Sequence, residues 1–288
     1  MPTHLPVTPL YPLFYEKLMR RALEEDLGRA GDLTTDAVVP PETRAEARLV
    51  ARSAGRIAGL AAALSAFSLL DSGLSIHILA GDGADVAAGT TLALIEGAAR
   101  PILSAERTAL NILGRLSGIA TATWQVVEQI RDLDTEITCT RKTTPCLRAL
   151  EKYAVRVGGG SNHRFGLDDA VLIKDNHLVV AGGLRPAILR ARAQIGHLVK
   201  IEVEVDTLSQ LEELLTLDVD AVLLDNMDPA TLRQAVAMVG RRIITEASGG
   251  ITPATVRAIA EPGVDMISLG WLTHTVRNFD VALDFQAL

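Results

Sequence analysis

The second half of the chain alternates short apolar runs with amphipathic segments. From Lys200 onward the apolar runs recur about every 20 to 22 residues, and the segments between them have helical spacing. Short apolar strands that alternate with helices are typical of parallel βα units, whose strands are buried on both faces. Six or more such units predict an α/β barrel or an open doubly wound sheet. The expected strands cover residues 137–139, 170–173, 199–205, 221–224, 243–246 and 266–269, and the expected helices include 208–217, 229–239 and 253–260.

Polar and charged residues stand at the carboxyl ends of these expected strands. In a barrel of parallel strands, the active site is built from the loops at this end. The pattern recurs at six successive strands, which favours a barrel-type enzyme over a non-enzymatic binding or carrier protein. The residues are Thr140, Arg141 and Lys142, then Lys174, Asp175 and Asn176, then Glu204 and Asp206, then Asp225 and Asn226, then Ser248, Gly249 and Gly250, and finally Gly270.

Cations are concentrated between residues 140 and 174. This stretch holds seven Lys or Arg against three acids, about +4, inside a chain of formal charge -7. Such a cluster costs self-repulsion unless a ligand or a counter-charge offsets it. Arg148, Lys152 and Arg156 stand at four-residue spacing, which predicts one solvated helix face. Arg141-Lys142, Arg164 and Lys174 adjoin glycine-rich or strand-like segments instead, and they predict an anion site.

Two glycine-containing strand ends suit a phosphate. Ser248-Gly249-Gly250 precedes Thr252, which we expect to be a helix N-cap, and Pro253, which we expect to be the first helical residue. Glycine lets the backbone approach a ligand, and a helix N-terminus offers N–H groups to an anion. Ser268-Leu269-Gly270 repeats the arrangement one unit later, and barrels commonly bind phosphate with their last two βα loops.

Glu204 and Asp225 end two neighbouring expected strands, so their carboxylates could lie close together. General acid–base work, Mg²⁺ ligation and hydrogen bonding to sugar hydroxyls all remain open for this pair. Other site classes lack support. The sequence has no HxxxH or CxxC metal motif, no GxxxxGK[ST] loop and no GxSxG elbow, and the GGGSNH run at 158–163 lacks the GxGxxG spacing.

Composition excludes several partners. A net charge of -7 and a pI near 5.4 argue against a nucleic-acid surface. The longest apolar run, 57–70, is too short to span a membrane, and the first fifteen residues lack the cationic start of a secretory signal. Cys139 and Cys146 cannot form a disulfide framework and are most simply buried small hydrophobes. We therefore expect a cytoplasmic protein with no membrane and no nucleic-acid partner.

The first half of the chain is more mixed. We expect helices at 13–27 and 59–70, a strand at 48–51, and two short strands around a turn at 81–97. Two short strands around a turn also occur in lipoyl or biotinyl carrier domains. Such carriers need an acceptor lysine, and none stands between Lys17 and Lys142, so a structural hairpin is the better interpretation. A long helix is expected at 101–130, with Ser104 as its cap. Arg107 near its start would be a surface residue or would help that end hold an anion.

Several long motifs carry a family resemblance. The sequence resembles the quinolinate phosphoribosyltransferase family, also called nicotinate-nucleotide pyrophosphorylase (carboxylating), over nearly its whole length. It departs from the family pattern at Cys146, where glycine is expected, and at Val157 and Ser161, which lie between the charged positions. The matching motifs are EDLGRAGDLTT (25–35), ERTALNILGRLSGIAT (106–121), TRKTTP (140–145), KYAVRVGGGSNHR (152–164), VLIKDNH (171–177), IEVEVD (201–206), LLDN (223–226), EASGGI (246–251) and SLGWLTH (268–274).

The resemblance implies both an activity and an architecture. The expected reaction joins quinolinate to 5-phosphoribosyl-1-pyrophosphate (PRPP) with Mg²⁺ and yields nicotinate mononucleotide, pyrophosphate and CO₂, a step of de novo NAD biosynthesis. The expected parts are an N-terminal α/β sandwich over 1–112 with the C-terminal tail 276–288, and an open, TIM-like α/β barrel over 113–275. The family acts as homodimers or dimer-based hexamers, in which Arg107 would serve the neighbouring subunit's site.

The resemblance also implies roles for the residues singled out above. Guanidinium groups suit the two carboxylates of quinolinate. Lys142, Glu204 and Asp225 would act at the reacting region, with Mg²⁺ arriving on the pyrophosphate and possible ligation by the two acids. Ribosylation makes the ring nitrogen cationic, so loss of the adjacent carboxylate leaves a stabilised ylide and needs no strong base. The implied quinolinate site is Arg107, Arg141, His163, Arg164 and Lys174, and the implied PRPP site is Thr140, Lys142, Glu204, Asp225, Ser248, Gly249, Gly250, Ser268, Leu269 and Gly270.

Two other kinds of enzyme are compatible with part of this pattern. A paralogue with the same fold, such as the pyrophosphorylase-like proteins associated with molybdenum transport, would use another acceptor. The intact set of Arg141, His163, Arg164 and Lys174 argues for a dicarboxylate instead. A Schiff-base aldolase would use Lys142 or Lys174 at a strand end, and borohydride trapping with a carbonyl substrate would reveal it.

Overall fold

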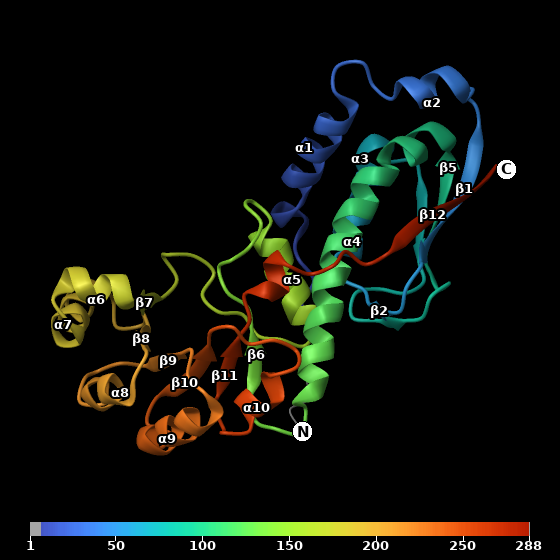
Figure 1. Cartoon of the computed structure of the whole chain (residues 1–288). Coiled ribbons are helices and arrows are strands. Elements are labelled where there is room, and N and C mark those ends of the chain that lie inside the picture. Colours follow the sequence, from blue (N-terminus) through green and yellow to red (C-terminus); the bar gives the residue numbers. More distant parts are fainter. Residues whose placement is uncertain (1–6, 288) are drawn as a thin grey trace. The chain divides into compact units, whose positions relative to one another are not determined.

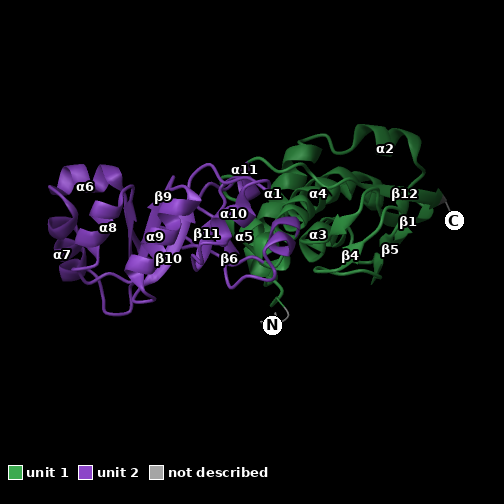
Figure 2. Ribbon diagram, turned by 60° about the horizontal axis from the view of Figure 1, so that its bottom comes forward, with its two compact units in different colours: residues 1–124, 144–159, 275–288 green, residues 125–143, 160–274 purple. Residues whose placement is uncertain are grey.

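The computed structural model describes residues 7–287, and its backbone is drawn in Figure 1. The first six residues, part of the segment that we expect not to be a secretory signal, lie outside the described range. The chain divides into two compact units, coloured separately in Figure 2. Unit 1 comprises residues 1–124, 144–159 and 275–288, and unit 2 comprises residues 125–143 and 160–274. The boundary that we expected between residues 112 and 113 falls inside a continuous helix, α4 (Ala99–Gln129).

Unit 1 is built on a four-stranded antiparallel sheet in the order β12-β1-β5-β3. The alternation of buried and exposed residues along β1 (Arg44–Ala51) gives the sheet one apolar face. β1 lies between β5 (Thr91–Ala98) and β12 (Val281–Ala287), and β3 (Ser75–Ile78) pairs with the far side of β5. The last described strand of the chain is therefore an edge of the N-terminal sheet.

The expected hairpin at 81–97 is wrong in its pairing. Two strands do form there, β4 (Asp85–Val86) and β5, but they do not pair with each other. β4 pairs with β2 (Gly55–Arg56), and β5 pairs with β1 and β3. The physical reason is burial, because Leu92, Ala93 and Ile95 on β5 are fully buried and require a longer partner than a two-residue strand.

The long helix α4 begins earlier than we expected. It starts at Ala99, so Ser104 lies inside the helix and is not its cap. The Ser104 hydroxyl donates to Asp32 instead, at 3.0 Å. Arg107 is consequently a mid-helix residue with a side chain 65% exposed, and its proposed place at a helix N-terminus is wrong. The other helices of unit 1 are η1 (Pro12–Phe14), α1 (Glu16–Leu27), α2 (Leu33–Val38), α3 (Leu60–Leu70) and α5 (Arg148–Val157).

Unit 2 is a six-stranded parallel sheet in the order β6-β11-β10-β9-β8-β7. β6 and β7 lie at the two edges and share no ladder within the described part of the chain, so the sheet stays open. Its helices α6 to α9 lie on the outer side of the sheet in Figure 1. The strands are β6 (Glu136–Thr138), β7 (Val171–Ile173), β8 (Ile201–Val205), β9 (Ala221–Asp225), β10 (Ile244–Ser248) and β11 (Met266–Ser268).

The protein is thus an α/β protein with an antiparallel N-terminal sheet and a parallel C-terminal sheet, as the sequence predicted. The prediction that Thr252 caps a helix beginning at Pro253 is wrong, because residues 253–255 form a turn and α10 begins at Val256. The helices of unit 2 are α6 (Asp175–Ala181), α7 (Leu184–Gln194), α8 (Leu208–Leu214), α9 (Pro229–Val239), α10 (Val256–Ala260) and α11 (Trp271–His274).

Three smaller expectations can be compared with the structure. Cys139 is buried as expected, whereas Cys146 is exposed. The solvated helix face expected from Arg148, Lys152 and Arg156 is wrong for Lys152, which is only 2% exposed on α5. None of the helices in the described range is both long and apolar enough to cross a membrane.

A buried ion pair joins α4 to α5 within unit 1. The Glu151 side chain is completely buried, and its carboxylate accepts hydrogen bonds from Arg115 Nε at 3.0 Å and Nη2 at 2.9 Å. Thr144 donates to the same carboxylate from its backbone N–H at 3.0 Å and from its hydroxyl at 2.7 Å. A buried charge with several donors is stable only while they remain in place.

We expect Arg115→Ala to destabilise unit 1 by about 3–5 kcal/mol, because the substitution leaves the Glu151 charge buried without its cation. Hydrogen exchange of the α4 and α5 amides reports this local loss of stability. Arg20→Ala is the matched control, since Arg20 pairs with Glu16 on the surface of α1 and its removal should cost about 0.5 kcal/mol. Equal protection in the two variants would mean that the buried pair contributes no more than the exposed one.

Candidate active site

The polar strand ends converge at one end of the parallel sheet of unit 2. Because all five strand pairs are parallel, their carboxyl ends lie along the same edge. Thr140 follows β6, Lys174 follows β7, Asp225 and Ser248 end β9 and β10, and Ser268 ends β11. The sequence predicted polar residues at these strand ends, and Arg141, His163 and Arg164 belong to the same unit, whereas Arg107 belongs to unit 1.

The loop after β6 is held at its base by local hydrogen bonds. The Lys142 backbone N–H donates to the Thr140 hydroxyl at 3.0 Å, and the Lys142 carbonyl accepts from the Thr273 hydroxyl at 2.7 Å. A Cβ at Gly270 would approach the Lys142 side chain to 2.9 Å, so this glycine leaves room for the lysine stem. Lys142 itself is exposed, and its ammonium lies on a fixed backbone at the strand ends.

Lys174 and Glu204 form an ion pair across β7 and β8. The Lys174 ammonium donates to the Glu204 carboxylate at 2.7 Å, and the two side chains are 47% and 11% exposed. A Schiff-base lysine attacks a carbonyl through a free amine, whereas the Lys174 nitrogen is held by a carboxylate of the neighbouring strand. The pairing therefore favours electrostatic substrate binding by Lys174 over an aldolase role.

The ends of β9 and β10 are linked through Asn226. Asn226 adopts a left-handed conformation with φ of 52°, donates its backbone N–H to the Ser248 carbonyl at 2.9 Å, and donates its side-chain amide to Asp225 at 2.6 Å. Gly249 has φ of 97°, and a Cβ there would collide with the Asn226 side chain. Only glycine fits this conformation and this close approach to Asn226, whereas a Cβ at the next residue, Gly250, would meet nothing within 4 Å.

Arg141 and Arg164 place two guanidinium groups near each other. Burial and the charge of Arg141 lower the pKa of Arg164, and the carboxylates of Glu202 and Asp169 oppose that change. Arg164 donates from Nη1 to the Ala170 carbonyl at 2.8 Å, while its buried Nε has no hydrogen-bond partner among the described residues. Two neighbouring, half-buried cations favour an anionic ligand, which would relieve their repulsion.

Beneath these cations lies a buried cluster that the sequence analysis missed. Nε2 of His163 is 2.8 Å from Glu202 Oε2 and 3.7 Å from Glu246 Oε2. Burial raises the pKa of Glu246 to about 7, the Glu202 carboxylate adds to this rise, and His163 and Ser268 oppose it. One atom from each of the three side chains lies within 4.8 Å of the others, a spacing that a metal ion could also use. The alternation in IEVEVD was an available signal, because it places Glu202 on the same strand face as Glu204.

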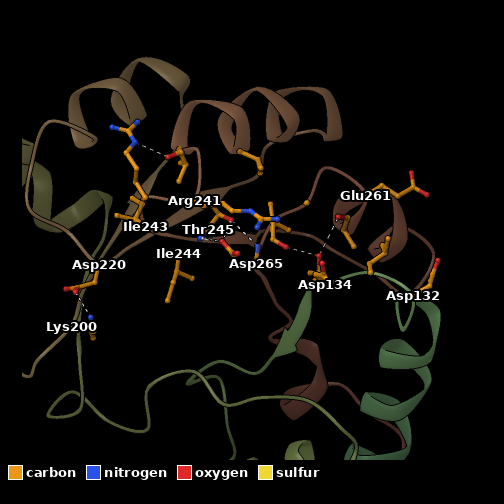
Figure 3. Close-up of a pocket in the computed structure, with 18 residues that line it drawn as sticks. Asp132, Asp134, Lys200, Asp220, Arg241, Ile243, Ile244, Thr245, Glu261 and Asp265 are labelled. Carbon is orange, nitrogen blue, oxygen red and sulfur yellow. Dashed lines mark hydrogen bonds and ion pairs between the residues drawn. The ribbon is translucent and has the colours of Figure 1, made fainter. Parts of the chain in front are cut away.

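A separate cavity opens at the other end of the sheet (Figure 3). Residues that precede or begin the strands line it, including Lys200, Asp220, Ile244 and Asp265. Its charged groups are largely paired, since Lys200 donates to Asp220 at 2.7 Å and the Thr245 hydroxyl donates to Asp265 at 2.6 Å. None of the predicted site residues lines this cavity, so the candidate site is the carboxyl end of the sheet.

Family models match almost the whole chain. The model for the quinolinate phosphoribosyl transferase N-terminal domain matches residues 32–117, and the model for the C-terminal domain matches residues 119–284. The chain belongs to the quinolinate phosphoribosyltransferase family. The C-terminal match includes every residue of the candidate site described above, and the N-terminal match includes Arg107.

Named relatives agree with this family. The chain is 45% identical over 269 residues to the probable nicotinate-nucleotide pyrophosphorylase (carboxylating) of Bacillus subtilis, covering 93% of this chain and 92% of the relative. It is 42% identical to the nicotinate-nucleotide pyrophosphorylase (carboxylating) of Mycobacterium leprae, covering 92% and 95%. These matches extend across both units, so the likeness is not confined to one sheet.

Solved structures share the fold. The crystal structure of NadC from Streptococcus pyogenes superposes with a TM-score of 0.94 at 38% identity, covering 98% of this chain and 99% of that one. The nicotinate-nucleotide pyrophosphorylase of Ehrlichia chaffeensis gives a TM-score of 0.91 at 37% identity, covering 94% and 98%. The open parallel sheet and the antiparallel sheet are therefore family features.

We expect Glu246→Gln to change how stability depends on pH. The folded-state pKa of about 7 lies above the ordinary 4.5, so the contribution of Glu246 is fully present below about pH 4.5 and is lost as the pH rises through about 7. The variant should therefore gain stability relative to the native protein from pH 5 to pH 8, by up to about 3 kcal/mol. Urea unfolding at each pH measures the difference.

Glu213→Gln is the control for this measurement, because Glu213 is exposed on α8. Its stability difference from the native protein should stay constant over the same range. A constant difference for Glu246→Gln as well would show that Glu246 keeps its ordinary protonation behaviour in the folded protein.

Proposed function

We propose that this chain joins quinolinate to PRPP at the carboxyl ends of the strands of unit 2, releasing nicotinate mononucleotide, pyrophosphate and CO₂. The protein is a nicotinate-nucleotide diphosphorylase (carboxylating), a phosphoribosyltransferase of de novo NAD biosynthesis. The observation that carries the site assignment is the meeting of two guanidinium groups, an ion-paired lysine and two strand-end carboxylates on one edge of one sheet.

The cationic side chains would bind quinolinate, the phosphoribosyl acceptor. Quinolinate carries two carboxylates beside a ring nitrogen, and guanidinium groups bind carboxylates through paired hydrogen bonds. Arg141 and Arg164 repel each other, so a dicarboxylate between them would gain both attraction and relief of that repulsion. We assign quinolinate binding to Arg141, His163, Arg164 and Lys174, with Arg107 added by a second subunit.

The donor end would use the polar ends of β9, β10 and β11. Gly250, left-handed with φ of 58° and with nothing within 4 Å of its Cβ position, would leave the backbone after Ser248 open to the 5-phosphate, and Gly249 sets the preceding turn against Asn226. Ser268, Leu269 and Gly270 follow on the neighbouring strand β11, and Thr140 lies at the end of β6. Glu204 and Asp225, on the paired strands β8 and β9, would accept hydrogen bonds from the ribose hydroxyls.

The same carboxylates fit the Mg²⁺ that the family reaction implies. Mg²⁺ prefers carboxylate and water oxygens and usually keeps several of its waters. Glu204 already accepts from Lys174 and Asp225 from Asn226, so we propose that both contribute to a site completed by the pyrophosphate rather than by protein ligands alone. When bound, Mg²⁺ would offset negative charge on the departing pyrophosphate.

Catalysis in this proposal consists of positioning and electrostatics. The sugar becomes oxocarbenium-like as pyrophosphate leaves, and the Glu204 and Asp225 carboxylates would stabilise that positive charge. Lys142, which the Thr140 and Thr273 hydrogen bonds hold at the strand ends, would neutralise charge on pyrophosphate. Ribosylation then makes the ring nitrogen cationic, which stabilises the carbanion left by loss of CO₂, so no strong base is needed.

The assembly and the cellular location are also proposals. We propose a homodimer, or a hexamer built from three dimers, in which exposed Arg107 on α4 reaches the partner's acceptor site. We retain the assignment of residues 1–112 with 276–288 to a sandwich domain and of 113–275 to a barrel domain. We propose a cytoplasmic protein, an assignment supported by the acidic composition and the two free cysteines.

The decisive assay incubates the pure protein with quinolinate, PRPP and Mg²⁺, and follows CO₂ and nicotinate mononucleotide, with nicotinate as the control acceptor. Product from quinolinate alone supports the proposal, because only the dicarboxylate can engage all the cations. No product from folded protein that still binds PRPP would leave the fold intact and reject the acceptor. In this assay Arg141→Ala should lower kcat/KM for quinolinate about 100-fold through loss of charged hydrogen bonds.

Arg156→Ala is the matched control for Arg141→Ala. Arg156 belongs to the same cationic stretch but is exposed near the end of α5. It should keep near-native kinetics, and the KM for PRPP should change little in either variant. An Arg141→Ala enzyme with near-native efficiency would contradict the acceptor assignment.

A further inference from the structure

We propose that Glu202 is a positioning residue that fixes the His163 ring as a partner for the acceptor carboxylates, with Glu246 as a second, more distant acid beside the same ring. The inference rests on the proposed function, because it concerns the acceptor end of that site. Neither carboxylate lies at a strand end, since Glu202 is the second residue of β8 and Glu246 the third of β10. They would act on the substrate only through His163.

The contact distances identify Glu202 as the primary partner. Nε2 of His163 is 2.8 Å from Glu202 Oε2, a full hydrogen bond, but 3.7 Å from Glu246 Oε2. The side chains of His163 and Glu202 are only 12% and 13% exposed, so solvent weakens the contact little. A histidine in a loop is thereby tied to a rigid strand of the sheet.

The chemistry of imidazole gives this contact a consequence for charge. The Glu202 carboxylate at 2.8 Å accepts from Nε2 and so fixes the direction of the ring, and a ring that also holds a proton on Nδ1 carries a positive charge. A charged ring adds a third positive group to Arg141 and Arg164. It would attract a dicarboxylate, whereas a neutral ring would contribute only a dipole.

Glu202 also offsets the charge of the neighbouring arginine. Its carboxylate opposes the lowering of the Arg164 pKa that burial and Arg141 cause. One buried acid therefore faces two of the proposed acceptor-binding cations. Glu246 lies deeper, 2% exposed, with its Oε1 lacking a hydrogen-bond partner in the described part of the chain. Its carboxylate interacts with that of Glu202, and both acids face the same His163 ring.

The test compares Glu202→Gln with the native protein in turnover and in quinolinate binding by calorimetry. Gln keeps the shape but removes the charge, so we expect KM and Kd for quinolinate to rise about tenfold, as for the loss of one charged hydrogen bond. The KM for PRPP should stay within about twofold, because no hydrogen bond or ion pair joins Glu202 to a donor residue in the described part of the chain. Glu246→Gln should shift the quinolinate constants less than Glu202→Gln does.

A double-mutant cycle with His163→Asn tests the route of action. If Glu202 acts through His163, Glu202→Gln should cost little more once His163 is Asn. An undiminished effect in that background would overturn the role through His163. Asp265→Asn is the control, since Asp265 also accepts side-chain and backbone hydrogen bonds in this sheet, at its other end, and should leave the quinolinate constants unchanged.

Two further results would decide between explanations. One equivalent of tightly held divalent metal in the native protein, absent from Glu202→Gln, would overturn the positioning role in favour of metal binding by the cluster. Native protein that neither binds nor converts quinolinate would reject the proposed function. Native turnover together with unchanged quinolinate constants in Glu202→Gln would reject only the present inference.

Discussion

The parallel direction of six strands is the constraint on which the site depends. Residues that are up to about 130 positions apart along the chain, from Thr140 to Gly270, meet because each follows or ends a strand that runs the same way. Loops of different length and composition can then supply cations, carboxylates and glycines to a common edge. The helices α6 to α9, which connect the strands, lie beside the sheet in Figure 1.

Charge is distributed in layers within this unit. Cations lie at the strand ends, and acids lie both among them, as Glu204 does beside Lys174, and below them, as Glu202 does beneath His163. An acidic protein can therefore hold a positive site without large self-repulsion. The arrangement also separates tasks, because exposed charges can meet a substrate whereas buried charges can only orient their neighbours.

Local periodicity in the sequence predicted the positions of the unit 2 strands. Features that depend on contacts between distant residues, such as strand pairing, were not predicted. Apolar runs located the strands of unit 2, and the polar residues after them located the site edge. The strand pairing in the 81–97 segment could not be predicted from local periodicity. β5 pairs with the distant β1, and this leaves β4 to pair with β2. The start of α4 was misplaced because Ser104 looks like a cap, although its hydroxyl contacts Asp32. The cluster of His163, Glu202 and Glu246 requires three segments to converge, and only IEVEVD hints at it.

The position of β12 has a consequence for the order in which the protein can form during synthesis. β12 is made after every element of unit 2, yet it pairs with β1 over residues 281–287. Until the ribosome has released that strand, one edge of β1 presents unpaired backbone groups, which can template contacts with other chains. All strands of unit 2 are synthesised before β12, so the sheet of unit 2 can form while the sheet of unit 1 still lacks its last strand. The sheet of unit 1 begins first and is completed last, so it is the part of the nascent chain most exposed to aggregation.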